Sequence, residues 1–390
     1  MDSSDSIVVI GAGSTGSSTA YHLAKAGRKA ILVDGGQVAS GMTSKSTAIV
    51  RTHYSNEIVA RMALYSLKVF REFSDFGFVD AGMLMLASAD EMTGMESNLA
   101  MLKRAGVDTY SLELERARKE FPEINFDKRE YVVYEPESGY ADPTSTANGY
   151  ATKAKELGAD LLLGRQVKSL QTENDQLTGI EFVDGSSLSC SKAILCTNIW
   201  TNKLLGRSGF SEDELLPIWA AAHPVVVLKR PEIYQGKKVI VADLPSKTYF
   251  KPEGKSLLFM GSLDSELDRQ STDPDNPPNE IPFEFTTSFS EIISHLVPVM
   301  KEGTLHSTYV GMYDMSPDQH PIIDELKVKG LYCCVGLSGH GFKLSPALGL
   351  MNSEMLFGKA GSQFDRSHFA LSRFKTGKLL ASKYALGTMA

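Results

Sequence analysis

A glycine-rich turn between two short apolar runs constrains this fold more than any other feature of the sequence. The run Ile7–Ile10 has β-strand character and leads directly into GAGSTG at residues 11–16. A helical stretch follows, and a second apolar run, Ala30–Val33, ends at Asp34. A strand, a G-x-G-x-x-G turn, a helix and a parallel strand in this order form a dinucleotide-binding unit. The sequence therefore predicts an α/β protein that opens with a Rossmann-like domain.

Each glycine of this turn has its own physical task. Gly11 permits the tight turn, Gly13 lets the backbone approach a pyrophosphate, and Gly16 allows the helix to pack on the strand. The first turn of the helix then offers free N–H groups and the positive end of the helix dipole to the phosphates. Asp34 can accept hydrogen bonds from both hydroxyls of an adenosine ribose and repels a 2′-phosphate, which disfavours NADP. The motif by itself fits FAD and NAD equally well.

The composition is that of a globular chain with a sizeable core. A length of 390 residues corresponds to about two or three domains. Hydrophobic residues make up 42% and charged residues 22%, which excludes a disordered or collagen-like chain. The formal net charge is −7 and the basic residues are scattered, so we expect neither a nucleic-acid partner nor binding to an anionic membrane.

The sequence carries no strong targeting or metal signal. No apolar run reaches about 18 residues, so we expect no transmembrane segment. The first hydrophobic stretch, residues 7–12, is too short for a signal peptide. The four cysteines include no C-x-x-C pair and suggest neither a disulfide framework nor zinc, and Cys333 and Cys334 are expected in a buried strand. We predict a cytoplasmic protein without a metal site.

Further elements follow from hydrophobic patterning. The alternation on either side of Asp184-Gly185 predicts a β-hairpin, and residues 216–262 are rich in strand-like runs. Four prolines within residues 273–282 predict a surface loop, after which a helix is expected over residues 290–300.

A second glycine turn lies far from the first in the sequence. The apolar strand Tyr332–Leu337 leads into Ser338-Gly339-His340-Gly341 and then into a helical stretch. This turn, like the first, presents backbone N–H groups. A nicotinamide enzyme needs only one such cradle, whereas a flavin also needs N–H dipoles near its pyrimidine end, where negative charge collects on reduction. The second turn therefore favours FAD over NAD.

Five segments in a fixed order carry a resemblance to a known family. They are the opening turn with Asp34, TAIVR at residues 47–51, TNIW at 197–200, MSPDQHP at 315–321 and GHGFK at 339–343. Together they resemble the FAD-dependent D-amino-acid oxidase superfamily, most of all its branch of sarcosine oxidase, dimethylglycine dehydrogenase and L-proline dehydrogenase β-subunits. The resemblance extends over nearly the whole chain, and GHGFK with the preceding serine is its most specific part.

The resemblance implies an α/β fold with two interleaved domains. A discontinuous Rossmann-like FAD-binding domain would comprise residues 1–85, 140–215 and 302–390, and an α+β substrate domain built on a mixed sheet would comprise 86–139 and 216–301. It also implies hydride transfer to flavin N5 during oxidation of a C–N bond in a small amino acid or N-methyl or secondary amino acid, such as sarcosine, proline or glycine. The electrons would pass to oxygen, a quinone or a partner subunit, and the likeness to β-subunits points to a hetero-oligomer.

The substrate site that the resemblance implies contains two cations and an aromatic wall. Arg51 and Lys343 match the residues that neutralise the substrate carboxylate, which is costly to bury without a charged partner. Tyr249 matches the aromatic wall of that site. Without the family, the same residues fit a surface salt bridge, a solvent-exposed lysine at a helix start and an ordinary strand tyrosine. We predict all three as catalytic residues.

The cofactor-binding residues come from both glycine turns and from matching segments between them. Ser44, Ser46 and Thr47 match the loop that passes the pyrophosphate and the ribityl chain. The backbone of Val167 matches the position that meets the adenine, and His340 either holds its turn or takes part in proton transfer. The predicted set is Gly11, Gly13, Ser14, Thr15, Gly16, Asp34, Gly35, Ser44, Ser46, Thr47, Val167, Thr197, Trp200, Gly339, His340, Gly341, Phe342 and Lys343.

Departures from the family pattern bear on the chemistry. The cysteine that attaches FAD covalently in monomeric sarcosine oxidase is replaced by Gly311, so we expect noncovalent FAD. Phe259 stands where the same enzyme has a lysine that helps oxygen accept an electron, and Ala48 replaces the second arginine of the family's loop. We therefore favour a dehydrogenase over an oxidase.

Three other functions stay open at this point. A family member of this kind could oxidise a 2-hydroxy acid or glycerol-3-phosphate, although a phosphate would need more cations than the sequence identifies. The chain could also be a noncatalytic or electron-relay subunit of a larger complex. A plain NAD-dependent dehydrogenase is the third alternative.

Overall fold

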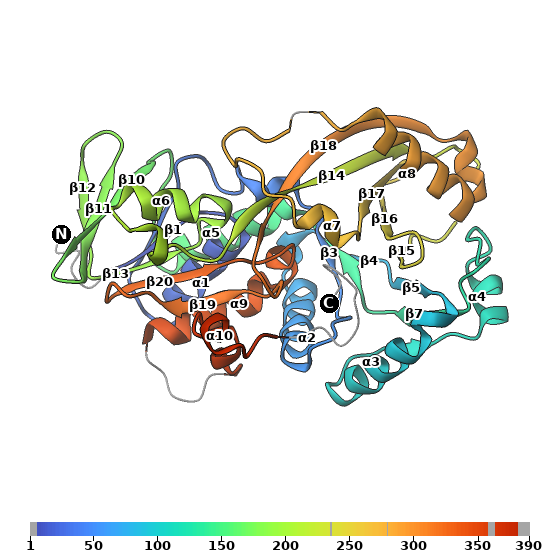
Figure 1. Ribbon diagram of the computed structural model, residues 1–390, viewed down its shortest axis with the longest axis horizontal. Helices are drawn as coiled ribbons and strands as arrows, with labels where there is room; N and C mark the ends of the chain where they lie inside the picture. The colour runs from blue at the N-terminus through green and yellow to red at the C-terminus, as the bar shows by residue number, and fades with distance from the viewer. Residues whose placement is uncertain (1–5, 235, 279, 358–362, 381–390) are drawn as a thin grey trace.

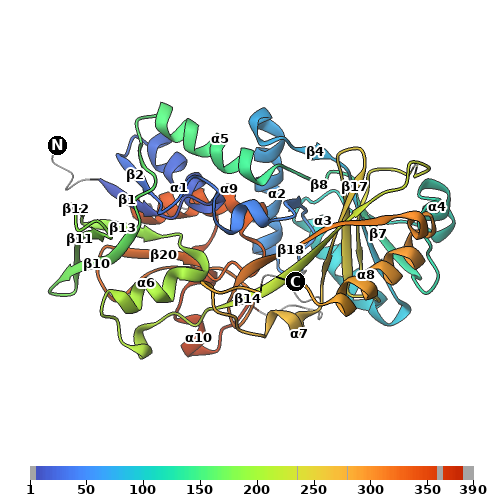
Figure 2. The ribbon, with the colours of Figure 1, turned by 90° about the horizontal axis from the view of Figure 1, so that it is seen from above.

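Two large β-sheets organise the structure, which is a computed structural model. It describes residues 6–234, 236–278, 280–357 and 363–380. Figure 1 shows the first sheet and its helices on the left and the second sheet on the right. The two long strands β14 (Trp219–Lys229) and β18 (Thr304–Met315) belong to the second sheet and reach back toward the first, as Figure 2 shows from above.

The first sheet has six strands in the order β19-β20-β13-β1-β2-β9. Its strands are β1 (Ile7–Ile10), β2 (Ala30–Val33), β9 (Asp160–Leu162), β13 (Lys192–Leu195), β19 (Ile322–Glu325) and β20 (Leu331–Val335). Neighbouring strands pair in parallel except β19 and β20, which are antiparallel. Cys333 and Cys334 are buried in β20, as predicted.

Both faces of the first sheet are covered, which is why its strands are continuous apolar runs. Ile7 and Val9 face a core built with α1 (Ser14–Lys25), α5 (Pro143–Glu156) and α9 (Gly341–Phe357), and α2 (Glu57–Glu72) packs on α9. Val8 and Ile10 face the opposite core, with the strands β10 (Val167–Glu173), β11 (Gln176–Phe182) and β12 (Ser187–Ser189) and the helix α6 (Thr201–Arg207). The predicted hairpin is confirmed as β11 and β12.

The second sheet has eight strands in the order β18-β14-β17-β16-β15-β5-β7-β6. Besides β14 and β18 they are β5 (Met83–Ala87), β6 (Tyr110–Ser111), β7 (Tyr131–Glu135), β15 (Ile240–Asp243), β16 (Thr248–Glu253) and β17 (Leu257–Ser262). The sheet is mixed, because β15 pairs in parallel with β5 and its other pairs are antiparallel. One face packs on α4 (Leu114–Glu120) and α8 (Phe283–Leu296), and the other on α3 (Met92–Arg104).

Small elements connect these regions. The strands β3 (Ile49–Val50), β4 (Val79–Asp80) and β8 (Gly139–Tyr140) form a three-stranded sheet, and α7 (Ser265–Asp268) and α10 (Arg373–Thr376) are short helices. Within the residues described, no helix is long and apolar enough to cross a membrane.

The predicted helix over residues 290–300 is wrong at both ends. The structure has α8 from Phe283 to Leu296, with Pro282 at its N-cap position. The sequence FEFTTSF at its beginning is rich in aromatic and β-branched residues, which hid its helical nature. Its buried residues recur at helical spacing, because packing on the second sheet decides the local structure: Thr286, Phe289, Ile293 and Leu296.

The predicted fold class is confirmed: an α/β protein with a Rossmann-like sheet and a second, mixed sheet. The predicted domain boundaries stay a prediction. Both β5 and β18, near two of these boundaries, belong to the second sheet. Residues 381–390, which the prediction assigns to the FAD-binding domain, lie outside the described residues.

Candidate functional site

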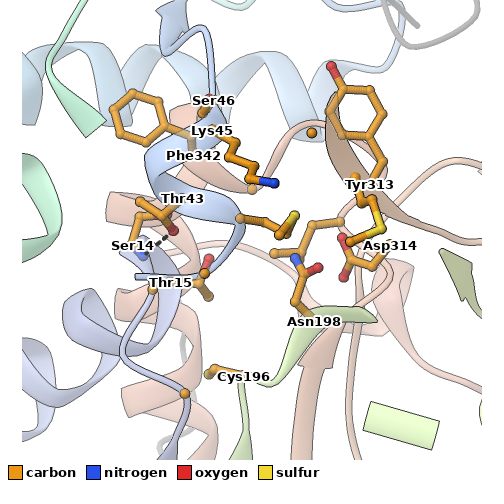
Figure 3. A pocket seen from close by; sticks show the side chains of 18 of the residues that line it. Ser14, Thr15, Thr43, Lys45, Ser46, Cys196, Asn198, Tyr313, Asp314 and Phe342 are labelled. Atoms are coloured by element: carbon orange, nitrogen blue, oxygen red, sulfur yellow. Dashed lines mark hydrogen bonds between the residues drawn. The ribbon is translucent and has the colours of Figure 1, made fainter. Parts of the chain in front are cut away.

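A cavity of about 560 Å³ lies at the carboxyl ends of the parallel strands of the first sheet (Figure 3). In open α/β sheets this edge is where ligands bind. Residues that follow four of the strands line it: Gly11 after β1, Asp34 after β2, Thr197 after β13 and Gly339 after β20. Strands β14, β16 and β18 of the second sheet supply residues on its other side. The cavity therefore lies between the two sheets.

The first glycine turn is packed too tightly for any side chain. A Cβ at Gly11 would lie 2.4 Å from the carbonyl oxygen of Cys196, and a Cβ at Gly16 would lie 1.8 Å from that of Gly11. Gly11 also has a φ of +108°, which side-chain-bearing residues rarely adopt. Asp34 anchors the turn, because its carboxylate accepts from the N–H of Ala12 at 2.7 Å. The backbone at this end of the cavity is therefore fixed for close approach to a ligand.

The second glycine turn reaches the same cavity through helix packing. Helix α9 begins at Gly341, two residues after Gly339, which has a φ of +78°. Halfway along α9, a Cβ at Gly349 would lie 2.2 Å from Oγ of Ser18 in α1, so the two helices pack closely side by side. Because of this packing, the N-termini of α1 and α9 both open on the cavity. Two helix N-termini, whose first backbone N–H groups have no partner within the helix, thus open on one cavity.

Arg51 and Lys343 bring two basic side chains to the cavity wall. Arg51 follows β3; its guanidinium lies 4.3 Å from the centre of the Tyr54 ring and donates to the carbonyl of His53. Lys343 is in the first turn of α9 and donates to the carbonyl of Gly339 at 3.0 Å. Burial and the nearby charge of Arg51 hold the pKa of Lys343 well below its usual value. An anion bound beside both groups would relieve this repulsion.

Three aromatic rings stand together at the second-sheet side of the cavity. His223 of β14 stacks on Tyr313 of β18, with ring centres 4.3 Å apart, and lies parallel to Tyr249 of β16 at 6.3 Å. The hydroxyl of Tyr249 lies 3.4 Å from Oγ1 of Thr47. Nδ1 of His223 lies 3.8 Å from a carboxylate oxygen of Asp268, which is also buried. Tyr249, the predicted aromatic wall, therefore stands beside the stacked rings of His223 and Tyr313.

Nearly all of the predicted site residues meet at this cavity. Arg51, Tyr249 and Lys343 line it, and so do all of the predicted cofactor-binding residues except Ser44 and His340. Ser44 is exposed and donates to the carbonyl of Gly41. His340 is buried behind its turn, where Nδ1 lies 3.3 Å from the hydroxyl of Tyr54. This position fits the alternative in which His340 holds the turn.

Sequence reasoning missed several residues of the lining. Asp314 on β18 is 2% exposed and faces the cavity beside Asn198, and its burial raises its pKa to about 7 (Figure 3). Lys45 extends into the cavity and donates to the carbonyl of Val310 at 3.1 Å (Figure 3). His223 was missed as well. Asp314 lies one residue before the MSPDQHP segment, which is the only signal that could have pointed to it.

The comparison with protein families decides the assignment of this site. The family model DAO, described as FAD dependent oxidoreductase, matches residues 6–355. The chain belongs to this DAO family. The resemblance expected from the sequence is therefore confirmed, and the protein is an FAD-dependent oxidoreductase.

Relatives and solved structures agree with membership in the DAO family. Sarcosine oxidase subunit beta of Rhodobacter capsulatus is 25% identical over 396 residues, which cover 98% of this chain and 91% of that protein. Dimethylglycine dehydrogenase of Rattus norvegicus is 25% identical and matches 86% of this chain but 41% of that longer protein. The crystal structure of L-proline dehydrogenase from P. horikoshii has a TM-score of 0.87 at 25% identity, covering 96% and 99% of the two chains.

The cavity of this DAO-family chain fits FAD. The first turn leaves no room for side chains where a pyrophosphate approaches, Asp34 stands at the end of β2, and two helix N-termini supply N–H groups. Gly11, Gly13, Asp34 and the turn at Gly339 would hold the cofactor.

Proposed function

We propose that this chain oxidises a small amino acid of the sarcosine, proline or glycine type at a carbon bonded to the amine nitrogen. The observation that carries the proposal is the pair of basic side chains, Arg51 and Lys343, at the cavity that fits FAD. A carboxylate is the anion of these substrates, and a bidentate guanidinium with an ammonium group is a suitable receptor for it. Relatives that are named sarcosine oxidase, dimethylglycine dehydrogenase and L-proline dehydrogenase support this class of substrate.

In this proposal the protein acts mainly by positioning. FAD, when bound, accepts a hydride from the carbon next to the nitrogen. Arg51 and Lys343 hold the carboxylate, and Tyr249, His223 and Tyr313 enclose the amine end of the substrate. The amine reacts as the neutral form, whose lone pair drives loss of the hydride, so no strong base is needed. The imine that results is hydrolysed by water.

The decisive experiment is anaerobic mixing of the FAD-loaded protein with candidate substrates. We expect sarcosine, L-proline, hydroxyproline or glycine to bleach the flavin absorbance. Lactate and glycerol-3-phosphate serve as the matched alternatives without an amine. Bleaching by these two alone, or by none of the six compounds, contradicts the proposal.

We propose a dehydrogenase that passes its electrons to a partner subunit or a quinone, since Phe259 replaces the family's oxygen-activating lysine and does not line the cavity. One observation favours oxygen as an alternative acceptor: Lys45 extends into the cavity, and a cation stabilises developing superoxide. Stopped-flow reoxidation of the reduced flavin by air separates the two. If air reoxidises the flavin of the wild type as fast as turnover, and Lys45→Met slows this reaction, the protein is an oxidase and the proposal of a dehydrogenase is wrong.

Noncovalent binding of FAD also remains a proposal. Gly311 lines the cavity and has no side chain to form a bond. We expect acid precipitation to give colourless protein and a yellow supernatant, and yellow precipitate contradicts it. The subunit name of the R. capsulatus relative supports a hetero-oligomer, and a cytoplasmic location stays a prediction.

A further inference from the structure

A buried polar cluster directly behind Arg51 takes no part in the function proposed above. It consists of Thr52, His53, Asn98, Glu135 and Ser138. Each of these residues is at most 3% exposed, and none of them lines the cavity. Buried polar groups are costly unless they are paired, so the cluster calls for a reason.

Glu135 is the centre of this cluster. One carboxylate oxygen accepts from the N–H of Thr52 at 3.2 Å, from its hydroxyl at 3.1 Å and from the hydroxyl of Ser138 at 2.9 Å. The other oxygen lies 3.4 Å from Nδ1 of His53. Burial works to raise the pKa of Glu135, but the contact with His53 and these hydrogen bonds outweigh it and hold the pKa below its ordinary value. Glu135 therefore carries a buried negative charge.

This charge holds the backbone that orients Arg51. The guanidinium of Arg51 donates to the carbonyl of His53, two residues further along. Thr52, the residue between Arg51 and His53, donates from its N–H and its hydroxyl to Glu135. Glu135 also contacts the ring of His53. The amide nitrogen of Asn98 lies 3.0 Å from the other ring nitrogen of His53. The carbonyl that receives Arg51 is thus fixed from several directions.

The cluster also ties two parts of the fold together. Glu135 ends β7 of the second sheet and Asn98 is on α3, whereas the Arg51 segment follows β3. A flexible arginine loses rotamer entropy when it is ordered, and prior fixation removes that cost from ligand binding. The same contacts do not touch the first glycine turn. Their effect is expected on anion binding and not on FAD binding.

We propose that Glu135 is a positioning residue for carboxylate ligands, which acts through Thr52 and His53 to preset the guanidinium of Arg51. This inference rests on the proposed function, because it takes Arg51 as the cation that binds the substrate carboxylate. A purely structural role of Glu135 would weaken the fold without discriminating between charged and neutral ligands.

The test compares two ligands that cannot be oxidised at an amine. Methoxyacetate has the shape of sarcosine with an ether oxygen in place of the nitrogen, and methoxyacetamide is its neutral counterpart. Both are titrated into FAD-loaded protein while the flavin absorbance is followed. For Glu135→Gln we expect the Kd of methoxyacetate to rise about tenfold and that of methoxyacetamide to change by less than about twofold.

A matched control removes a buried carboxylate elsewhere in the same sheet. Asp243 of β15 accepts two hydrogen bonds from Arg129, at 2.9 and 2.7 Å, and both residues are buried. We expect Asp243→Asn to lower the thermal unfolding temperature and to leave the Kd of methoxyacetate unchanged. Thr52→Val removes one donor to Glu135 at constant size and carries the test if Glu135→Gln does not fold. Its expected rise in the Kd of methoxyacetate is about threefold.

The outcomes separate this inference from the proposed function. If the wild type binds methoxyacetate and both Glu135→Gln and Thr52→Val keep its Kd, the positioning role is wrong and the proposed function stands. The positioning role is also wrong if Glu135→Gln raises the Kd of methoxyacetate and that of methoxyacetamide equally. It is wrong as well if Asp243→Asn raises the Kd of methoxyacetate alone. If the wild type neither binds methoxyacetate nor is bleached by an amino acid, the proposed function itself fails.

Discussion

The two ends of the cavity are built in different ways. At the first glycine turn, backbone groups and small residues from one continuous stretch form the wall, and Gly16 approaches Gly11 within a distance that excludes a Cβ. At the opposite end, side chains do the work: Arg51, Lys343 and Tyr249 arrive from three separate parts of the chain. The first end suits a cofactor common to many enzymes, whereas the second can be changed one side chain at a time. Cofactor binding and substrate choice are therefore separable by mutation.

The largest expected effect is at the backbone end. Gly16→Ala places a Cβ where only 1.8 Å is available to the carbonyl oxygen of Gly11, so the turn must open and FAD binding should be lost. The measurement is the flavin content of the purified protein. Gly206→Ala is the control, because nothing lies within 4 Å of a Cβ there and alanine favours a helix. An FAD-loaded Gly16→Ala protein with wild-type affinity would contradict this description of the turn.

Lys343→Met should affect the side-chain end alone. In the proposed complex Lys343 pairs with the substrate carboxylate inside the cavity. Removing one partner of a buried ion pair typically costs about 3–5 kcal/mol, so kcat/KM for the amino-acid substrate should fall by about a hundredfold or more. FAD should stay bound. The protein should also become more resistant to heat in the absence of ligand, because a desolvated ammonium beside Arg51 is removed. Unchanged kcat/KM, measured by steady-state kinetics, would remove Lys343 from the site.

Asp314 gives the expected pH dependence. Burial raises its pKa from 3.8 to about 7, so the stability that the protonated form contributes is fully present below pH 4 and is lost as the pH rises through 7. Asp314→Asn cannot ionise. The unfolding free energy is measured in urea between pH 4 and 8. The value for Asp314→Asn minus that for the wild type should increase by on the order of 3 kcal/mol as the pH rises over this range. Parallel curves for the two proteins would show that Asp314 does not titrate as described.

Tyr249→Phe should give the smallest effect. It keeps the ring that stacks beside His223 and removes only the hydroxyl, which lies 3.4 Å from Thr47. We expect kcat/KM to fall by about two- to fivefold and the Kd of methoxyacetate to stay constant. Thr47→Val and the double variant complete a cycle, in which additive losses would show that the two hydroxyls do not interact.

The difference between the backbone end and the side-chain end of the cavity also explains how much of the site the sequence could predict. The first end is local: Gly11 to Asp34 carry its glycine spacing, helix and strands within one short stretch, and the structure has them there. His223, Asp314 and Glu135 had no comparable signal, because their roles depend on strands of the second sheet that meet only after folding. Arg51, Lys343 and Tyr249 were found through family resemblance, since nothing local marks a lone arginine, lysine or tyrosine. Local physics predicts the cofactor end, and tertiary packing decides the substrate end.

The close packing of α1 on α9 through Gly349 has a consequence for biogenesis. The two glycine turns that would hold the cofactor are separated by more than 300 residues. Ribosomes add about 5–20 residues per second. The opening segment must then wait on the order of half a minute, in an incomplete state, before its counterpart leaves the ribosome. Binding of FAD is thus a late event. A nascent chain halted before residue 339 would carry no FAD and would be colourless, even with FAD in excess.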